Sequence, residues 1–450
     1  MDLFGTAGIR GDAQRDVTPS LALRVGRAAG ADGRTFVLGR DGRVTGPALA
    51  AALEAGLESA GATVQRVGQV PTPALAYASQ GKRGVMVTAS HNPPHDNGIK
   101  LFVDGREYDR DAELRVERGV VDEAAPADWT EWGRLEHQEV LPGYRDAVAA
   151  YAREHGAALD GLRVAVDCGN GMASRATPQV LRDLGAEVVA LNANVDGHSP
   201  GRESKPTAES LADLRRFIGD GEFALGLGHD GDADRIVVID GNGEVVHEDT
   251  VLAILAEHYV RASDAGDPVV VTTPNASGRI DERVTAAGGR TERVRLGALH
   301  EGIADARAAG GPDTSVAFAA EPWKHVHTGF GGWIDGVASA AVIGRLVAAE
   351  GLDGLREPVT ERPYRKRSVS CPDSEKTRVM AQLGDRLPDR YPAAEVDDEH
   401  GVRLTFADNS WVLVRPSGTE PYVRLYAESD EVDSLADEVE GIIETTVAAE

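Results

Sequence analysis

The 450-residue chain contains little cysteine, lysine or aromatic side chain. Its two cysteines, Cys168 and Cys371, cannot build a disulfide framework or a cysteine-rich zinc site, which favours a reducing compartment. The first residues, MDLFGTAGIRGDAQ, lack the apolar segment of a secretion signal, and no apolar run could span a bilayer. We therefore expect a cytoplasmic protein without a membrane partner.

Positive charge is also scarce, with 47 lysine and arginine residues against 73 acidic ones and a net charge of -26. No basic cluster is long enough to follow a phosphate backbone, so nucleic acid is excluded as a partner. An acidic chain with only six lysines is typical of salt-loving microbes, in which salt screens the repulsion. A GC-rich genome would give a similar composition, and the sequence leaves this alternative open.

Three segments share one pattern, in which an apolar strand ends in a polar loop, a helix follows and a glycine closes the helix before another strand. The pattern predicts three βαβ-type units with mixed or parallel sheets. Each unit is given by its strand and its helix: 34–43 with 47–62, 162–171 with 177–187, and 267–278 with 279–289.

The C-terminal ninety residues differ, because the strands expected at 402–406, 411–415 and 422–428 precede a closing helix. This order indicates an α+β domain. The fold class is therefore α/β, with three similar mixed-sheet domains and a C-terminal α+β domain around a central cleft. The expected domains are 1–140, 141–245, 246–357 and 358–450, with 357–369 as a linker or opening strand.

The segment TASHNPPHDNGIK (88–100) follows an apolar strand and places Ser90, His91 and Lys100 on one loop. Two prolines stiffen this loop, and Asn97-Gly98 turns the chain into the next strand. A serine hydroxyl is a poor nucleophile without a base or a metal, so the loop taken alone is better explained as a surface turn.

The segment GLGHDGDADRIVVID (226–240) alternates Asp230, Asp232 and Asp234 with small residues, which directs the carboxylates to one side of an extended loop. Convergent carboxylates repel one another unless a hard cation lies among them. An EF-hand is excluded, because its glycine and glutamate positions hold Arg235 and Gly241. A magnesium site fits better than a solvated acidic turn.

Two further turns concentrate anion donors. In VLVRPSGTEP (412–421), Arg415, Ser417, Gly418 and Thr419 form a turn suited to phosphate, although a simple hairpin turn has similar residues. Near the start, FGTAGIRG brings Arg10 to a glycine-rich turn.

Together these four segments resemble the α-D-phosphohexomutase family, which includes phosphoglucomutase, phosphomannomutase and phosphoglucosamine mutase. They occur in that family's order, and the resemblance covers nearly the whole chain. It implies a phosphosugar mutase that moves a phosphoryl group between the 1- and 6-positions of a hexose phosphate through a sugar bisphosphate. It also implies Mg²⁺ as cofactor and a monomer or homodimer.

The resemblance assigns the following roles. Ser90 would carry the phosphoryl group; Asp230, Asp232 and Asp234, with Ser90, would bind magnesium; Arg10, His91, Lys100 and Arg235 would line the reaction centre; Arg415, Ser417, Gly418 and Thr419 would hold the other phosphate.

The sugar-recognition loop departs from the family pattern GE-x-SGH. In FAAEPWKHVH (318–327), Glu321 and His325 keep the Glu and His positions, whereas Trp323 and Lys324 replace Ser and Gly. The resemblance implies that Glu321 binds sugar hydroxyls and that His325 acts near the acceptor oxygen. An indole and an extra cation would change the shape and charge of the pocket.

The substrate therefore stays open. Phosphoglucomutase or phosphomannomutase activity is the first expectation, and phosphoglucosamine mutase or phosphopentomutase is the alternative. A phosphosugar phosphatase would keep the chemistry but let water take the phosphoryl group. A non-catalytic phosphosugar-binding protein is the alternative from another class.

The acidic composition leads to a salt test. We expect the melting temperature to rise with KCl concentration, because salt screens the repulsion between the carboxylates. Thermal unfolding followed by circular dichroism across a KCl series measures this, and a melting temperature indifferent to salt would contradict the halophilic interpretation.

Overall fold

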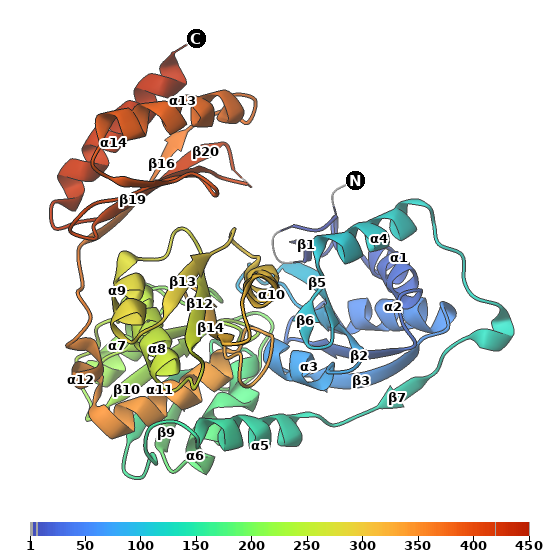
Figure 1. The fold of residues 1–450 in the computed structure, drawn as a ribbon. Coiled ribbons are helices and arrows are strands. Elements are labelled where there is room, and N and C mark those ends of the chain that lie inside the picture. Colours follow the sequence, from blue (N-terminus) through green and yellow to red (C-terminus); the bar gives the residue numbers. More distant parts are fainter. Residues whose placement is uncertain (1–2, 6–7, 419, 450) are drawn as a thin grey trace. The chain divides into compact units, whose positions relative to one another are not determined.

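The protein consists of two compact units (Figure 1). In this computed structural model the first unit holds the residues up to Val251 together with Phe318–Arg356. The second holds Leu252–Ala317 together with the residues from Glu357 onward. The structure describes residues 3–5, 8–418 and 420–449.

The first unit begins with a seven-stranded mixed sheet in the order β1-β5-β4-β2-β3-β7, with β6 paired to β5. Strands β4, β2, β3 and β7 run parallel, whereas β5 is antiparallel to both β4 and β1. The loop between β4 and β5 therefore connects two neighbouring antiparallel strands of the sheet. The strands are β1 (Ile9–Asp12), β2 (Thr35–Arg40), β3 (Thr63–Gln69), β4 (Arg83–Val87), β5 (Asp96–Val103), β6 (Arg106–Glu107) and β7 (Leu135–His137).

Three helices and one face of this sheet share a buried core. The first two helices pack closely because glycines leave room: a Cβ at Gly26 would lie 2.4 Å from the carbonyl oxygen of Leu53, and one at Gly56 would lie 2.3 Å from that of Leu23. The three helices are α1 (Pro19–Gly30), α2 (Gly46–Ser59) and α4 (Arg110–Val121). Helix α3 (Thr72–Ala78) and a 3₁₀ turn η1 (Trp129–Glu131) complete the helical elements of this part. Helix α1 starts at a Thr18 cap followed by proline, a strong start signal.

A second sheet in this unit has the order β11-β10-β8-β9. Strand β8 is parallel to β9 and β10, and β10 and β11 form an antiparallel pair around the aspartate loop. The elements are α5 (Leu141–Ala152), β8 (Arg163–Asp167), η2 (Met172–Arg175), α6 (Thr177–Asp183), β9 (Glu187–Leu191), α7 (Ala212–Gly219), β10 (Leu225–His229) and β11 (Ile236–Ile239).

The last part of the first unit is a hairpin followed by a buried helix. Strand β14 (Thr314–Glu321) enters it and pairs antiparallel with β15 (Lys324–Val326). Asp335 caps helix α11 (Gly336–Glu350) and accepts a hydrogen bond of 2.8 Å from the Tyr144 hydroxyl. A short helix α12 (Leu352–Arg356) ends this part.

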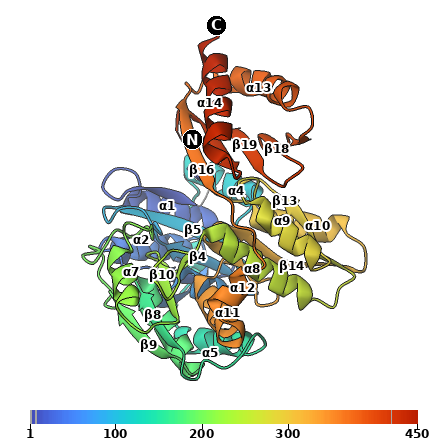
Figure 2. The same cartoon turned by 90° about the vertical axis from the view of Figure 1, so that its left-hand side faces the viewer.

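The second unit contains a parallel pair of strands and an antiparallel C-terminal sheet. The first group is α8 (Glu248–Arg261, which begins in the first unit), β12 (Asp267–Thr272), α9 (Gly278–Ala286), β13 (Arg290–Arg293) and α10 (Leu299–Ala309). The C-terminal sheet has the order β16-β20-β19-β18-β17, and α13 and α14 cover one of its faces (Figure 2). Its elements are β16 (Tyr364–Ser370), α13 (Lys376–Arg390), β17 (Glu395–Asp397), β18 (Val402–Thr405), β19 (Trp411–Pro416), β20 (Tyr422–Glu428) and α14 (Val432–Ala448).

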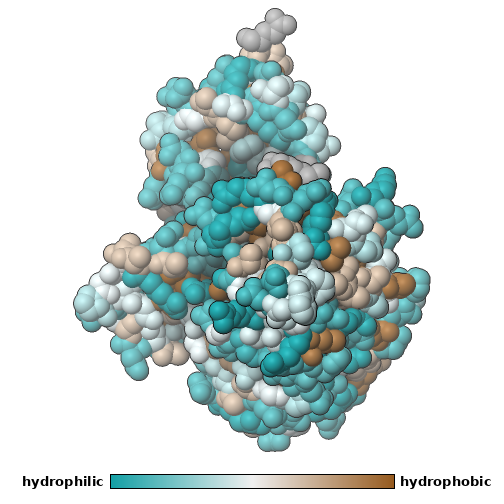
Figure 3. Space-filling model, turned by 90° about the vertical axis from the view of Figure 1, so that its right-hand side faces the viewer, coloured by the Kyte–Doolittle hydropathy of each residue, from teal (hydrophilic) through white to brown (hydrophobic). Residues whose placement is uncertain are grey.

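The expected fold class is confirmed, with mixed α/β sheets followed by an α+β sheet. Residues 364–370 form an opening strand rather than a linker. The exact boundaries of four domains stay a prediction. In the described part of the chain no helix is long and apolar enough to cross a membrane. The face shown in Figure 3 is mostly hydrophilic, with small separate hydrophobic patches, as the acidic composition implies.

Candidate active site

Ser90 lies in the loop between β4 and β5 and is completely buried. Its φ is +52°, a left-handed conformation that costs a serine on the order of 1 kcal/mol or more. The Thr88 hydroxyl helps to fix it by accepting a hydrogen bond of 2.9 Å from the Ser90 backbone N–H. A strained residue that its surroundings hold in place is typical of a functional site.

The Ser90 hydroxyl points at the aspartate loop and donates a 2.6 Å hydrogen bond to Oδ2 of Asp230. On its other side, the Nδ1 atom of His91 lies 3.2 Å from the Ser90 hydroxyl oxygen. Two loops that are 140 residues apart therefore meet at one oxygen atom.

The three aspartates of the loop between β10 and β11 are buried, and one oxygen from each lies within 4.8 Å of the others. Burial, followed by repulsion from Asp234 and Asp232, raises the pKa of Asp230 well above its usual range. For Asp234 burial acts in the same direction, but the charges of Lys100 and Arg235 outweigh it and hold its pKa below the usual range.

These carboxylates fit a hard cation. The Oδ1 atoms of Asp232 and Asp234 are buried and have no hydrogen-bond partner among the described residues. Unused carboxylate oxygens that converge in a buried site are the ligands that Mg²⁺ and similar cations prefer. The other oxygen of Asp232 is occupied, since it accepts a 2.6 Å hydrogen bond from the Thr72 hydroxyl.

Lys100 enters the site from β5 and is buried between two carboxylates. Its ammonium lies 3.1 Å from Asp234 and 3.3 Å from Glu107. Burial alone would lower its pKa, but Glu107 and Asp234 more than compensate and raise the pKa above its usual range. Lys100 is therefore protonated at neutral pH.

His91 is neutral in this environment. Burial, with the positive charges of Arg235 and Arg10, lowers the pKa of His91 to about 2. The Nε atoms of both arginines are buried without a hydrogen-bond partner in the described part of the chain. The structure thus brings four of the predicted residues, Arg10, His91, Lys100 and Arg235, together around Ser90 and the aspartates.

The predicted sugar loop forms the tip of the β14–β15 hairpin. Glu321 pairs with Lys324 across the tip, and Trp323 adopts a φ of +68° in the turn between them. The Trp323 indole packs against the core of the second sheet. Its effect on the shape of a sugar pocket stays a prediction. The carbonyl of Trp323 also accepts a 3.1 Å hydrogen bond from Ile236.

His325 is buried on β15, and burial lowers its pKa to about 3. Its Nδ1 atom lies 3.0 Å from the Ser339 hydroxyl, whereas its Nε2 atom has no partner among the described residues. His325 is therefore a neutral side chain with one ring nitrogen still available.

The predicted phosphate turn lies at the end of β19 in the second unit. Arg415 donates to the Tyr426 hydroxyl at 2.8 Å and stacks on its ring, which orients the guanidinium. The turn itself is braced by Lys376, which donates to the carbonyl of Ser417 at 2.6 Å. Gly418 follows in the same turn, and the predicted contribution of Thr419 lies outside the described residues.

Arg43 was not predicted, although it organises the whole serine loop. It is buried, and its Nε donates a 3.0 Å hydrogen bond to Asp41. Its remaining donors bind four carbonyl oxygens of the serine loop, at 2.6–2.9 Å: those of Ser90, Asn92, Pro93 and Asp96. The signal in the sequence was the GRDGR segment at the end of β2, which we interpreted only as a strand end.

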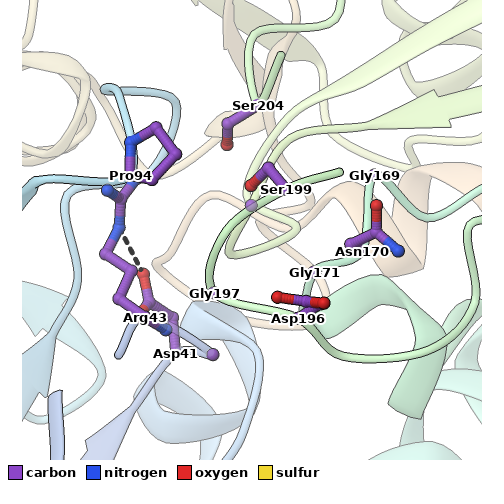
Figure 4. A pocket seen from close by; sticks show the side chains of 12 residues that line it. Asp41, Arg43, Pro94, Gly169, Asn170, Gly171, Asp196, Gly197, Ser199 and Ser204 are labelled. Carbon is purple, nitrogen blue, oxygen red and sulfur yellow. Dashed lines mark hydrogen bonds and ion pairs between the residues drawn. The ribbon is translucent and has the colours of Figure 1, made fainter. Parts of the chain in front are cut away.

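A pocket behind the serine loop shows how the two sheets of the first unit join there (Figure 4). Arg43 and Pro94 line one side, and glycine-rich loops of the second sheet line the other. Ser204 reaches across and donates a 3.0 Å hydrogen bond to the Ser90 carbonyl. Gly231 also approaches closely, since a Cβ there would lie 2.7 Å from the same oxygen.

A strained serine, a buried trio of carboxylates and a ring of cationic side chains define a site for phosphoryl transfer. Comparison with known proteins agrees. Models of the phosphoglucomutase/phosphomannomutase family match residues 1–126 (alpha/beta/alpha domain I), 142–243 (alpha/beta/alpha domain II) and 369–445 (C-terminal domain). The chain belongs to this family, and it is an enzyme of the phosphomutase class, an intramolecular phosphotransferase.

Two curated relatives span almost the whole chain. The phosphopentomutase of Thermococcus kodakarensis is 40% identical over 95% of this chain and 94% of its own. A probable phosphoglucosamine mutase of Methanopyrus kandleri is 38% identical over 99% and 98%.

A solved structure of a phosphoglucomutase/phosphomannomutase family protein from Burkholderia thailandensis has a TM-score of 0.86 at 25% identity and covers 99% of this chain and 98% of its own. At 17% identity, the fold is also that of the Aspergillus fumigatus N-acetylphosphoglucosamine mutase solved with GlcNAc-6P and magnesium, with a TM-score of 0.63 over 100% of this chain and 96% of its own.

The bridge from Thr72 to Asp232 can be tested through metal affinity. We expect Thr72→Val to weaken Mg²⁺ binding roughly 10- to 100-fold, since groups that orient a metal ligand typically contribute this much. Titration calorimetry with MgCl₂ measures the change. Thr72→Ser keeps the hydroxyl and serves as the matched control; equal affinity in wild type and Thr72→Val would show that this hydrogen bond is irrelevant.

The role of Arg43 can be tested with a lysine, which keeps the charge but has too few donors for Asp41 and all four carbonyls. We expect Arg43→Lys to lower kcat by roughly 100-fold, the order seen when a reacting group is slightly misplaced. Arg66→Met, which removes a half-buried pair with Glu54, is the control. Unchanged kcat in a folded Arg43→Lys enzyme would argue against loop positioning.

Proposed function

We propose that this enzyme transfers a phosphoryl group between two positions of a sugar phosphate through a phosphorylated Ser90 and a sugar bisphosphate. The observation that carries the proposal is the 2.6 Å hydrogen bond from Ser90 to Asp230, because it places a hydroxyl beside a convergent set of buried carboxylate oxygens. Asp230, Asp232 and Asp234 are the proposed ligands of Mg²⁺, together with the oxygen on Ser90. When bound, the cation would offset negative charge on the phosphoryl oxygens.

The side chains around Ser90 have complementary tasks. As the bond between phosphorus and the Ser90 oxygen breaks, a bond to a sugar hydroxyl forms; that hydroxyl loses its proton while the serine oxygen gains one. Lys100, which its partner carboxylates keep protonated, is the proposed proton donor. Arg10 and Arg235 stabilise charge on the equatorial oxygens, and neutral His91 holds the serine oxygen by a hydrogen bond.

The sugar and its second phosphate require further contacts. Glu321 is the proposed ligand of sugar hydroxyls, and His325, through its available nitrogen, acts near the acceptor oxygen. Arg415, Ser417, Gly418 and Thr419 are proposed to hold the phosphate that is not transferred. This turn can accept either phosphate of the intermediate, because it recognises charge rather than the shape of the sugar.

For the substrate we propose a hexose phosphate, with phosphoglucomutase or phosphomannomutase activity first. A pentose phosphate is the second candidate, favoured by the 40% identity to a phosphopentomutase over nearly the full length. Several relatives are named probable phosphoglucosamine mutases, so hexosamine phosphates belong in the same panel. We further propose that the enzyme works in the cytoplasm, where its two buried thiols would remain reduced.

The reaction is tested by coupled assays with a panel of hexose, hexosamine and pentose 1-phosphates in KCl and MgCl₂, each with its matching bisphosphate as activator. We expect isomerisation of at least one sugar class and a phosphate on Ser90 by mass spectrometry. Release of free phosphate as fast as isomerisation would support a phosphatase instead, and binding without turnover a non-catalytic protein.

Replacing the serine tests the phosphoryl carrier. We expect Ser90→Ala to reduce isomerisation to background with an unchanged circular dichroism spectrum, because no other group takes the phosphoryl group from the substrate. Ser79→Ala, at another buried serine of the first unit, is the control. A Ser90→Ala enzyme with wild-type activity would overturn the assignment.

A further inference from the structure

Lys324 occupies a fixed position beside the aspartate loop, which lies between β10 and β11. It faces Glu321 at the end of the β14–β15 hairpin, and the residue before it, Trp323, is bound to the backbone of Ile236 at 3.1 Å. Ile236 follows Asp234 by only two residues. The indole of Trp323 packs against the core beneath the same loop, so the tip of the hairpin is held on two sides.

The positive charge of Lys324 reaches the reaction centre. It is among the charges that lower the pKa of Glu107, the carboxylate that binds the ammonium of Lys100. The backbone hydrogen bond between Trp323 and Ile236 places this charge next to the loop that holds Asp234.

Lys324 has donors to spare. Among the described residues its only ionic partner is Glu321, at 3.5 Å, which is longer than an ordinary hydrogen bond. The side chain nevertheless keeps only 16% of its exposure, so the ammonium is sheltered but still reachable by a ligand. An ammonium carries three N–H donors, and at this distance Glu321 leaves most of them for another acceptor.

We propose that Lys324 is a further binding residue for the phosphoryl group in transit between Ser90 and the sugar. Its ammonium donates to a non-bridging phosphoryl oxygen, while Glu321 steadies the lysine from behind. This inference rests on the proposed function of the site. It assigns to the hairpin a contact with phosphate in addition to the contact of Glu321 with sugar hydroxyls.

Transfer of phosphate from glucose 1,6-bisphosphate to Ser90, followed by mass spectrometry of the intact protein, tests the proposal. We expect Lys324→Met to slow this transfer roughly 100-fold, the order observed when one donor to developing charge is removed. Lys324→Arg keeps a cation and should recover most of the rate. Lys82→Met, at another half-buried lysine of the first unit, is the matched control. A rate for Lys324→Met equal to that of wild type would overturn the proposal.

A second comparison separates phosphate binding from mere support of Glu321. If Lys324 contacts phosphate, Lys324→Met must also slow transfer when Glu321 is already replaced by glutamine. Loss of the effect in the Glu321→Gln background would mean that Lys324 acts only through Glu321, and the proposal would be wrong.

Failure of the proposed function can be distinguished from failure of the Lys324 proposal. If the proposed function is wrong, the wild-type protein remains unphosphorylated at Ser90 with every bisphosphate. In that case the affinity for inorganic phosphate, measured by calorimetry with Mg²⁺, decides the role of Lys324. Tenfold weaker binding by Lys324→Met supports a phosphate contact, and unchanged affinity refutes it.

Discussion

Mutual repulsion among three buried carboxylates is the constraint on which the rest of this site depends. Charged groups of one sign are costly in a dry environment unless partners or a cation compensate them. Here the compensation comes from several parts of the first unit: Lys100 from β5, Thr72 from the start of α3 and the hydroxyl of Ser90. Each of these contacts ties the first sheet to the loop of the second. The same contacts therefore compensate the charge of the aspartates and join the two sheets.

Strained backbone conformations also occur in the loops that form this site. Nine described residues other than glycine have a positive φ, and three of them occur in the loops that meet here: Ser90, Ala233 and Trp323. A serine, an alanine and a tryptophan gain little from this conformation by themselves, unlike asparagine or glycine. Packing and hydrogen bonding from outside each loop must supply the difference. For Ser90 the outside support comes chiefly from Arg43, whose guanidinium gathers four carbonyl oxygens.

Much of this arrangement could be predicted from the sequence, because it depends on local patterns. Because Asp230, Asp232 and Asp234 alternate with small residues, their side chains are expected to point in one direction. The apolar runs on either side of them predict the two strands. Thr72 and Arg43 were missed for the opposite reason. A threonine before a proline and an arginine in a GRDGR segment have ordinary local explanations, and their partners are up to 160 residues away. The packing of the Trp323 indole could not be predicted either, since only the folded chain shows that a hydrophobic core lies within its reach.

The hydrogen bond between Trp323 and Ile236 has a thermodynamic consequence. It makes the hairpin that we propose faces the sugar and the loop that we propose holds the cation share one backbone anchor, so neither can shift without disturbing the other. A sugar bound at the hairpin should then change the affinity of the aspartate loop for the cation. By linkage, the bound cation must change the affinity for the sugar by the same factor. Sugar and cation would in that case be cooperative ligands of a single mechanical element.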